Sequence, residues 1–147
     1  IAALWKARKA LSPLLREIAP KKINEDVVVP VDALPQFLAG LTQLSNQYRL
    51  HNVNFGHAGN GNIHVNLLIN PDNPDEVARA EKCLDEVFSL VIKLRGTLSG
   101  EHGVGSEKRA FVTKEIDAST LNLMRAIKRV FDPDNILNPG KLFPAAD

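Results

Sequence analysis

The sequence is poor in cysteine, tryptophan and tyrosine. Among its 147 residues it has one cysteine, one tryptophan and one tyrosine. A single cysteine, Cys83, excludes an internal disulfide, so the fold has to be held by its core. Cys83 lies within an apolar helical pattern, which favours a packing role over a reactive thiol. With 44% hydrophobic residues, a chain of this length can bury a sizeable core without cross-links.

The sequence also lacks an excess of charge of either sign. Its 18 Lys and Arg oppose 17 Asp and Glu, which gives a net charge of +1. The basic pairs Lys21-Lys22 and Lys108-Arg109 are short and are not interleaved with aromatic residues, so we expect no nucleic-acid partner. No apolar run approaches the roughly 18–20 residues of a membrane span, and the first residues do not resemble a signal peptide. We therefore expect a cytoplasmic protein, with peripheral association to a membrane left open.

Repeats, low-complexity segments and linkers are missing as well, so we expect residues 1–147 to form one domain. The chain opens with IAALWKARKAL, which is already a helical pattern and has no initiator Met. From this opening we expect a piece of a longer polypeptide.

Hydrophobic periodicity predicts helices that alternate with a few strands. We expect one or two helices over 2–18, interrupted at Ser12-Pro13, and further helices from an Asp32 cap to Arg49, over 75–95, from a Ser106 cap to Thr113, and from an Asp117 cap to Phe131. We expect strands at 22–31, at or near a sheet edge, at 52–57, at 62–69 and briefly at 97–99. This order predicts an α+β fold, a ferredoxin-like plait whose mostly antiparallel sheet has helices packed on one face.

Two histidines flank the segment that connects the second and third of these strands. The Asn60-Gly61 pair predicts a two-residue hairpin turn, and the register of that turn places His57 directly opposite His64. Opposed Cβ atoms lie roughly 4.5–5.5 Å apart, which suits two imidazoles that bind one ion. The alternative is a pair of half-exposed polar residues in a hairpin, and a metal site therefore requires a third ligand.

The strand at 62–69 has two unlike faces. Ile63, Val65, Leu67 and Ile69 point to one side, which we expect to be the core. His64 and Asn66 point to the other, so the Asn66 amide can reach the same pocket as the histidines. Asn66 is equally consistent with a polar residue on a solvated face.

The segment GEHGVG offers the missing ligand. Glu101 supplies a carboxylate that can complete a His2Glu site with an open coordination position, and His102 adds a titratable group beside it. Three ligands and an open position indicate a catalytic rather than a structural metal. Zinc is the first choice, and iron and manganese are alternatives. The segment does not match the GxGxxG dinucleotide fingerprint, and we reject a Rossmann fold.

Three motifs in this order, GHAGNGNIHVN, SGEHGVGSEKR and DPDNILNPGKLFP, carry a family resemblance. The chain resembles the C-terminal domain of the flavin-dependent 2-hydroxy-acid dehydrogenases. This family includes the glycolate oxidase flavoprotein subunit, D-lactate dehydrogenase and D-2-hydroxyglutarate dehydrogenase. The resemblance extends from Leu4 to Pro144.

The resemblance implies how the chain would act. In that family a separate N-terminal domain, not contained in residues 1–147, holds FAD, and the C-terminal domain closes the substrate pocket over the flavin. His57, His64 and Glu101 are then the metal ligands. His102 lies at the flavin and takes the hydroxyl proton of a small 2-hydroxy acid while the Cα hydride passes to the flavin. The implied partners are the FAD domain, the substrate and an electron acceptor or other oxidase subunits.

The resemblance also implies further contacts. Arg8 corresponds to an arginine that binds the substrate carboxylate, which suits a bidentate guanidinium, although its periodicity alone indicates a solvated helix residue. Ser12, one turn later, either binds substrate or caps a helix that restarts at Pro13. Lys22 corresponds to a substrate-binding lysine of the family, which precedes the VVVP strand, only if a gap in the alignment with the family is moved. Asn138 and Lys141 would lie near the flavin, or would simply form a turn.

Three hypotheses follow for function. The first is the substrate- and metal-binding domain of an FAD-dependent enzyme that oxidises a D-2-hydroxy acid to a 2-oxo acid, inactive by itself. The second is a stand-alone module that binds metal and a carboxylate ligand without redox chemistry. The third is a metallohydrolase that uses zinc-bound water with His102 as base.

Overall fold

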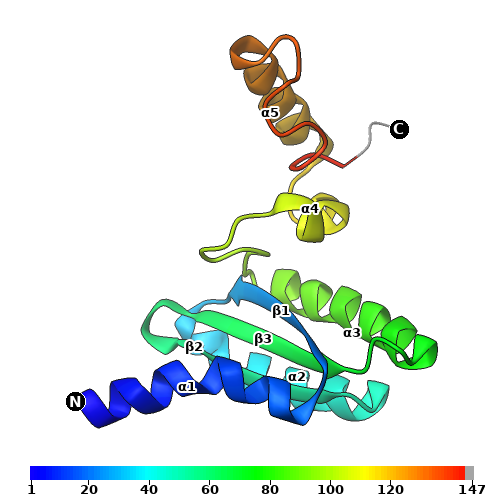
Figure 1. Cartoon of the computed structure of the whole chain (residues 1–147). Coiled ribbons are helices and arrows are strands. Elements are labelled where there is room, and N and C mark those ends of the chain that lie inside the picture. The colour runs from blue at the N-terminus through cyan, green and yellow to red at the C-terminus, as the bar shows by residue number, and fades with distance from the viewer. Residues whose placement is uncertain (145–147) are drawn as a thin grey trace.

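The centre of the protein is a three-stranded antiparallel sheet. The structure is a computed structural model and describes residues 1–144. Strands β1 (Lys21–Val28), β2 (His51–His57) and β3 (Asn62–Ile69) are ordered β1-β3-β2, so β3 lies in the middle and is buried along its whole length (Figure 1). The predicted α+β class and the edge position of the first strand are confirmed, and the arrangement is consistent with a ferredoxin-like plait.

Helices α2 (Leu34–Tyr48) and α3 (Pro74–Lys93) cover one face of this sheet. Their apolar faces meet the odd-numbered side chains of β3, as the alternation of that strand predicted. The centre of the resulting core consists of fully buried side chains from the sheet and both helices: Val27, Val65, Leu67, Phe37, Leu41, Val87, Phe88 and Val91. The opposite face of the sheet, which carries His64 and Asn66, is therefore the face on which polar groups collect.

Helix α1 (Ala2–Ile18) lies against this second face. Two contacts join it to strand residues there: Ser12 accepts a hydrogen bond from Lys22 of β1 at 2.6 Å, and the Arg8 guanidinium lies over the ring of Phe55 in β2 at 5.1 Å. Pro13 is contained within the helix and does not divide it into two.

Of the three predicted helix caps, only Asp117 is confirmed. The side chains of Asn73 and Asp117 accept backbone N–H groups at the starts of α3 and α5 (Ala118–Phe131), as capping residues do. The Asp32 and Ser106 caps were wrong. Asp32 lies within a 3-10 turn, η1 (Val31–Ala33), and Ser106 lies within the short helix α4 (Gly105–Lys108). In both places the residue before the helix already has helical dihedral angles, so the extended capping conformation does not form.

The predicted hairpin register was also wrong. His57 pairs with Asn62, and Phe55 pairs with His64. The connection is longer than a two-residue turn, because residues 58–60 form the 3-10 turn η2 (Ala58–Asn60) and Gly61 follows with φ of 71°. The observed partner of His57 is two residues from the predicted one, and the side chains of a strand alternate between its faces with a period of two. His57 therefore stays on the same face as His64, as a diagonal rather than a direct neighbour.

The chain beyond α3 extends away from the sheet (Figure 1). The predicted strand near residue 97 is only an isolated bridge between Thr97 and Val28. The 3-10 helix η3 (Arg109–Lys114) packs on α3, with the rings of Phe111 and Phe88 4.6 Å apart. Helix α5 and the tail lie farther out. Within residues 1–144, none of the helices has the length and apolar character needed to cross a membrane.

Candidate functional site

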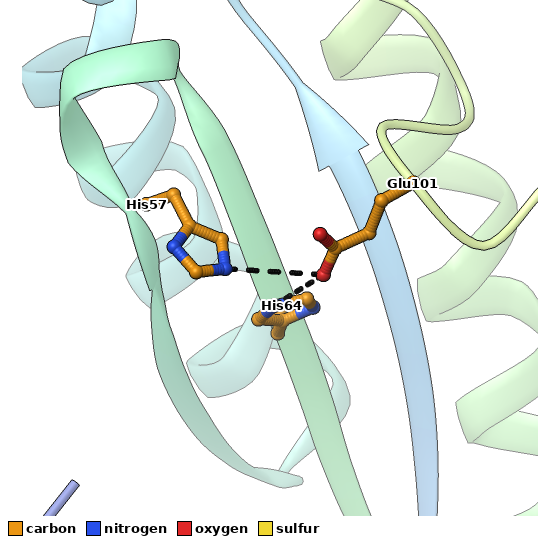
Figure 2. Close-up of side chains that lie close together, drawn as sticks. All are labelled: His57, His64 and Glu101. Atoms are coloured by element: carbon orange, nitrogen blue, oxygen red, sulfur yellow. Dashed lines mark ion pairs between the residues drawn. The ribbon is translucent and has the colours of Figure 1, made fainter. Parts of the chain in front are cut away.

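His57, His64 and Glu101 converge on the polar face of the sheet (Figure 2). The two histidines come from β2 and β3, and Glu101 reaches them from the glycine-rich loop, residues 100–105. Oε1 of Glu101 lies 3.2 Å from Nε2 of His64 and 3.9 Å from Nε2 of His57. One ligand atom from each of the three residues lies within 4.8 Å of the others. We call these three residues the donor cluster.

The donor cluster fits a divalent metal ion. Ligand atoms around a tetrahedral zinc with bonds of about 2.0–2.1 Å lie about 3.4 Å apart, and the two distances from Oε1 of Glu101 to the histidines, 3.2 and 3.9 Å, are close to this value. Burial lowers the pKa of His64, so its imidazole is neutral near pH 7 and has a lone pair to donate. Nδ1 of His64 is buried without a hydrogen-bond partner, which leaves Nε2, the nitrogen facing Glu101, as the donor. Half of the His57 and Glu101 side chains is exposed, so the cluster is open on one side.

His102 lies beside the donor cluster. Its ring stacks on that of His64, with centroids 5.4 Å apart and planes 22° apart. Its Nδ1 lies 3.3 Å from Oδ1 of Asp26, and its Nε2 lies 4.0 Å from Oε1 of Glu101. The contact with Asp26 occupies one ring nitrogen and leaves the other, Nε2, near the Glu101 carboxylate of the donor cluster. This arrangement allows His102 to exchange a proton with a molecule bound there.

Sequence analysis missed Asp26, which is completely buried in β1 opposite His64. Its Oδ2 accepts backbone N–H groups from Gly100 at 2.7 Å, from Glu101, and from His102 at 3.2 Å. Its Oδ1 accepts a hydrogen bond from Lys108 at 2.7 Å. Burial by itself raises the pKa of Asp26, but the bonds from Lys108, Glu101 and His102 outweigh it and lower the pKa to about 2.

Sequence analysis also missed Lys108. Its side chain is buried and donates to Oδ1 of Asp26 and to the carbonyl oxygens of Asp26 and Leu98, at 2.6 and 2.8 Å. The available signal was the pair Glu25-Asp26 within an apolar, β-branched run, because a carboxylate in a buried strand needs a partner. Nothing in the sequence identified Lys108 as that partner.

Two of the predicted substrate-binding residues, Arg8 and Asn66, lie near the donor cluster. Arg8 and His57 line one cavity of about 410 Å³, together with Ile1, Leu4, Trp5 and Gly56. Asn66 is fully buried on the polar face and donates to the carbonyl oxygens of Val53 and His64, at 2.9 and 3.0 Å. Its side-chain oxygen has no hydrogen-bond partner.

The other two, Ser12 and Lys22, bond to each other where α1 crosses β1. Burial, followed by the charge of Arg16, lowers the pKa of Lys22. Lys22 of β1 pairs with Leu68 of β3, and Asn24 of β1 pairs with Asn66 of β3. Leu68 and Asn66 are two residues apart, so Lys22 and Asn66 lie on the same face of the sheet. All four predicted substrate-binding residues therefore belong to α1 and the polar face of the sheet.

Asn138 and Lys141 are not brought to the donor cluster. They line a cavity of about 670 Å³ between α5 and the tail, away from the sheet in Figure 1. Five of the residues that line this cavity are basic: Arg109, Arg125, Lys128, Arg129 and Lys141. Arg109 also donates to the carbonyl oxygen of Gly140, which holds the tail against the end of α4.

Comparison with known proteins assigns the chain to a family. The family described as "FAD linked oxidases, C-terminal domain" matches residues 1–142. The chain belongs to this family. Among curated relatives of this FAD-linked oxidase domain, the glycolate oxidase subunit GlcD of Escherichia coli (strain K12) is 39% identical over 140 residues, which cover 95% of this chain and 28% of the relative.

Two further relatives of the FAD-linked oxidase domain have different names. The D-2-hydroxyglutarate dehydrogenase of Stutzerimonas stutzeri (strain A1501) is 37% identical over 147 residues, covering 97% of this chain and 31% of the relative. The probable mitochondrial D-lactate dehydrogenase of Danio rerio is 32% identical over 141 residues, covering 95% and 28%. The chain thus spans less than a third of the length of each relative.

Proposed function

We propose that this chain is the substrate- and metal-binding domain of an FAD-dependent enzyme that oxidises a D-2-hydroxy acid to a 2-oxo acid. The observation that carries the proposal is the convergence of His57, His64, Glu101 and His102 in a chain of the FAD-linked oxidase family. The names of the relatives support it, since each names a glycolate, D-lactate or D-2-hydroxyglutarate enzyme. Residues 1–147 would form one domain, with FAD held mainly by another part of the polypeptide.

His57, His64 and Glu101 would hold a divalent metal, with zinc preferred over iron or manganese for two imidazoles and a carboxylate. When bound, the metal supplies Lewis acidity that lowers the pKa of a hydroxyl, and FAD supplies an acceptor for the two electrons and one proton of the Cα hydride. The open side of the donor cluster leaves room for the hydroxyl and carboxylate oxygens of a substrate.

His102 would act as the general base. Its Nδ1 is held by the Asp26 carboxylate, so Nε2 is the atom that would receive the hydroxyl proton as the alcohol becomes a carbonyl. His102 and the flavin together would then remove the two protons and two electrons by which the hydroxy acid and the oxo acid differ.

The remaining side chains on this face would bind and orient the acid. Arg8 lines the same cavity as His57 and can pair with the substrate carboxylate through two parallel N–H donors. The side-chain oxygen of Asn66, on the same face of the sheet, has no hydrogen-bond partner. Ser12 and Lys22 are hydrogen-bonded to each other at the edge of this face. Asn138 and Lys141 would meet the flavin from the tail, where the surrounding basic side chains favour an anionic group.

Anaerobic single-turnover reduction of the flavin in the full-length protein tests this function. D-lactate, glycolate and D-2-hydroxyglutarate should be offered separately. The L enantiomers of lactate and 2-hydroxyglutarate serve as controls. Bleaching of the flavin by a D acid, together with about one bound divalent metal per chain, is the expected result. A metal-free protein whose flavin is reduced at the same rate would overturn the metal-assisted part, and no reduction by any of these acids would overturn the oxidation itself.

A further inference from the structure

The glycine-rich loop carries both Glu101 and His102, yet it has no regular secondary structure before α4 begins at its last residue, Gly105. Gly103 and Gly105 adopt positive φ angles of 79° and 57°, and an added Cβ at either would meet no other atom within 4 Å. Such a segment has many accessible conformations, and ordering each of its residues costs backbone entropy. Something outside the loop has to hold it against the sheet.

The Asp26 carboxylate makes that contact. Three consecutive backbone N–H groups, those of Gly100, Glu101 and His102, donate to its Oδ2. Three donors directed at one oxygen define both the position and the orientation of the loop backbone. The side chains of Glu101 and His102 then leave this backbone toward the donor cluster.

Lys108 provides the countercharge. Asp26 is completely buried and Lys108 is only 2% exposed, so neither charge would be stable without the other. All three hydrogens of the Lys108 ammonium have partners, at Oδ1 and the carbonyl oxygen of Asp26 and at the carbonyl oxygen of Leu98. Glu25 lies farther from Lys108, at 3.6 Å, and makes no bond to the loop.

We infer that Asp26, paired with Lys108, is the positioning residue that delivers Glu101 to His57 and His64 and at the same time orients His102. The inference rests on the proposed function, because it concerns the same donor cluster. Asp26 is not itself a ligand or a base: it acts through the loop backbone and through Nδ1 of His102. Partners in the second coordination shell typically contribute 10–100-fold to metal affinity.

The fold contains a matched control for the loss of a buried, loop-binding carboxylate. Asp132, at the end of α5, accepts the backbone N–H groups of Ile136 and Leu137 and pairs with Lys128, away from the sheet. Asp132→Asn therefore removes the same kind of interaction as Asp26→Asn, but not at the donor cluster. Glu25→Gln is a second control, because Glu25 is adjacent to Asp26 and forms an ion pair with Lys108 rather than a bond to the loop.

The experiment measures Co²⁺ binding to the full-length protein through the visible absorption of the bound ion, together with amide hydrogen exchange in the metal-free form. In Asp26→Asn we expect Co²⁺ affinity to fall by about 10–100-fold and the absorption spectrum to change. Exchange at Gly100, Glu101 and His102 should accelerate by roughly 10-fold, since a neutral acceptor replaces a charged one. Asp132→Asn and Glu25→Gln should retain wild-type Co²⁺ affinity, spectrum and exchange at the loop.

A double variant guards against misfolding. Asp26→Asn leaves Lys108 buried without its countercharge, whereas Asp26→Asn with Lys108→Met removes both charges. The double variant should fold, as judged by circular dichroism, and show the same loss of Co²⁺ affinity. Wild-type affinity and spectrum in the folded double variant would overturn the inference. Failure of the wild type to bind Co²⁺ would instead overturn the proposed metal site, while accelerated loop exchange would still show that Asp26 holds the loop.

Discussion

Nε2 of His64 lies 3.2 Å from Oε1 of Glu101, which joins the central strand of the sheet to a loop that follows α3. His64 is almost fully buried and Glu101 is half exposed, so the pair lies at the boundary between the sheet and the open side of the cluster. A cation placed there would bind the neutral imidazole of His64 from the sheet and the carboxylate of Glu101 from the loop.

The first prediction concerns the ligands. His64→Ala and Glu101→Ala should each reduce bound divalent metal from about one per chain to a background level, because two remaining donors bind zinc weakly. The matched control is His51→Ala, since His51 is an exposed histidine at the start of the same hairpin and lies outside the donor cluster. Metal analysis after dialysis gives the result. Equal metal content in wild type, His64→Ala and Glu101→Ala would remove the basis of the site.

The second prediction separates His102 from its neighbour. His102→Asn keeps a polar side chain of similar reach but cannot accept a proton at Nε2. It should retain metal while the single-turnover rate of flavin reduction falls by about 10²–10⁴-fold, the usual contribution of a general base. Loss of metal in this variant would place His102 among the ligands instead, and an unchanged rate would exclude it as the base.

The third prediction concerns Arg8. Arg8→Ala removes a guanidinium that shares a cavity with His57, so a substrate carboxylate would lose a charged, two-point contact. We expect substrate affinity to fall by roughly 10–100-fold, measured as the concentration dependence of single-turnover flavin reduction. Lys9→Ala changes an exposed cation at the next position of α1 and should leave this affinity unchanged. Equal losses in both variants would indicate a general electrostatic effect rather than a specific contact.

The fourth prediction is a pH dependence. The pKa of Asp26 is about 2 in the folded protein, compared with 3.8 as its ordinary value, so its carboxylate stabilises the fold above about pH 4 and this contribution is lost as the pH falls toward 2. The shift corresponds to about 2 kcal/mol for this buried group. Urea unfolding of wild type and Asp26→Asn between pH 2 and 7 should give a stability difference that is constant above about pH 5 and shrinks on acidification. A difference that does not change with pH would contradict the prediction.

The fifth prediction compares two glycines of the hairpin. Gly61 has φ of 71°, and an added Cβ would lie 1.9 Å from the carbonyl oxygen of Val29, whereas a Cβ at Gly59 would meet nothing within 4 Å. Gly61→Ala should therefore lower the free energy of unfolding by about 2–5 kcal/mol, through backbone strain and overpacking together. Gly59→Ala should change it by less than about 0.5 kcal/mol. Chemical denaturation of both variants tests the contrast, and equal effects would mean that the turn does not have this geometry.

The sequence by itself determined the three strands of the sheet, although it also predicted a strand near residue 97, and it determined which face of β3 is polar. Alternation along 62–69 assigns Val65 and Leu67 to the core and His64 to the other side, because side chains of a strand alternate with a period of two. The same period explains why the wrong hairpin register still placed His57 and His64 on one face. An error of two residues moves a side chain along the strand but not through the sheet.

Helix boundaries depended on backbone geometry that the sequence did not reveal. The cap at Asp117 was predicted correctly because this residue precedes its helix in an extended conformation. Asp32 and Ser106 have the same chemistry, but the chain enters both helices through residues that are already helical. Local composition cannot distinguish these two situations, since the neighbouring packing selects the conformation.

Only the tertiary structure decided how Glu101 and His102 are held. Asp26 and Lys108 are far apart in the chain, and each taken alone is an ordinary charged residue. They meet because β1 pairs antiparallel to β3, which places Asp26 opposite His64, and because the segment after α3 returns across the end of the sheet. A buried ion pair depends on the three-dimensional position of both charges, and periodicity along a sequence carries no information about that position.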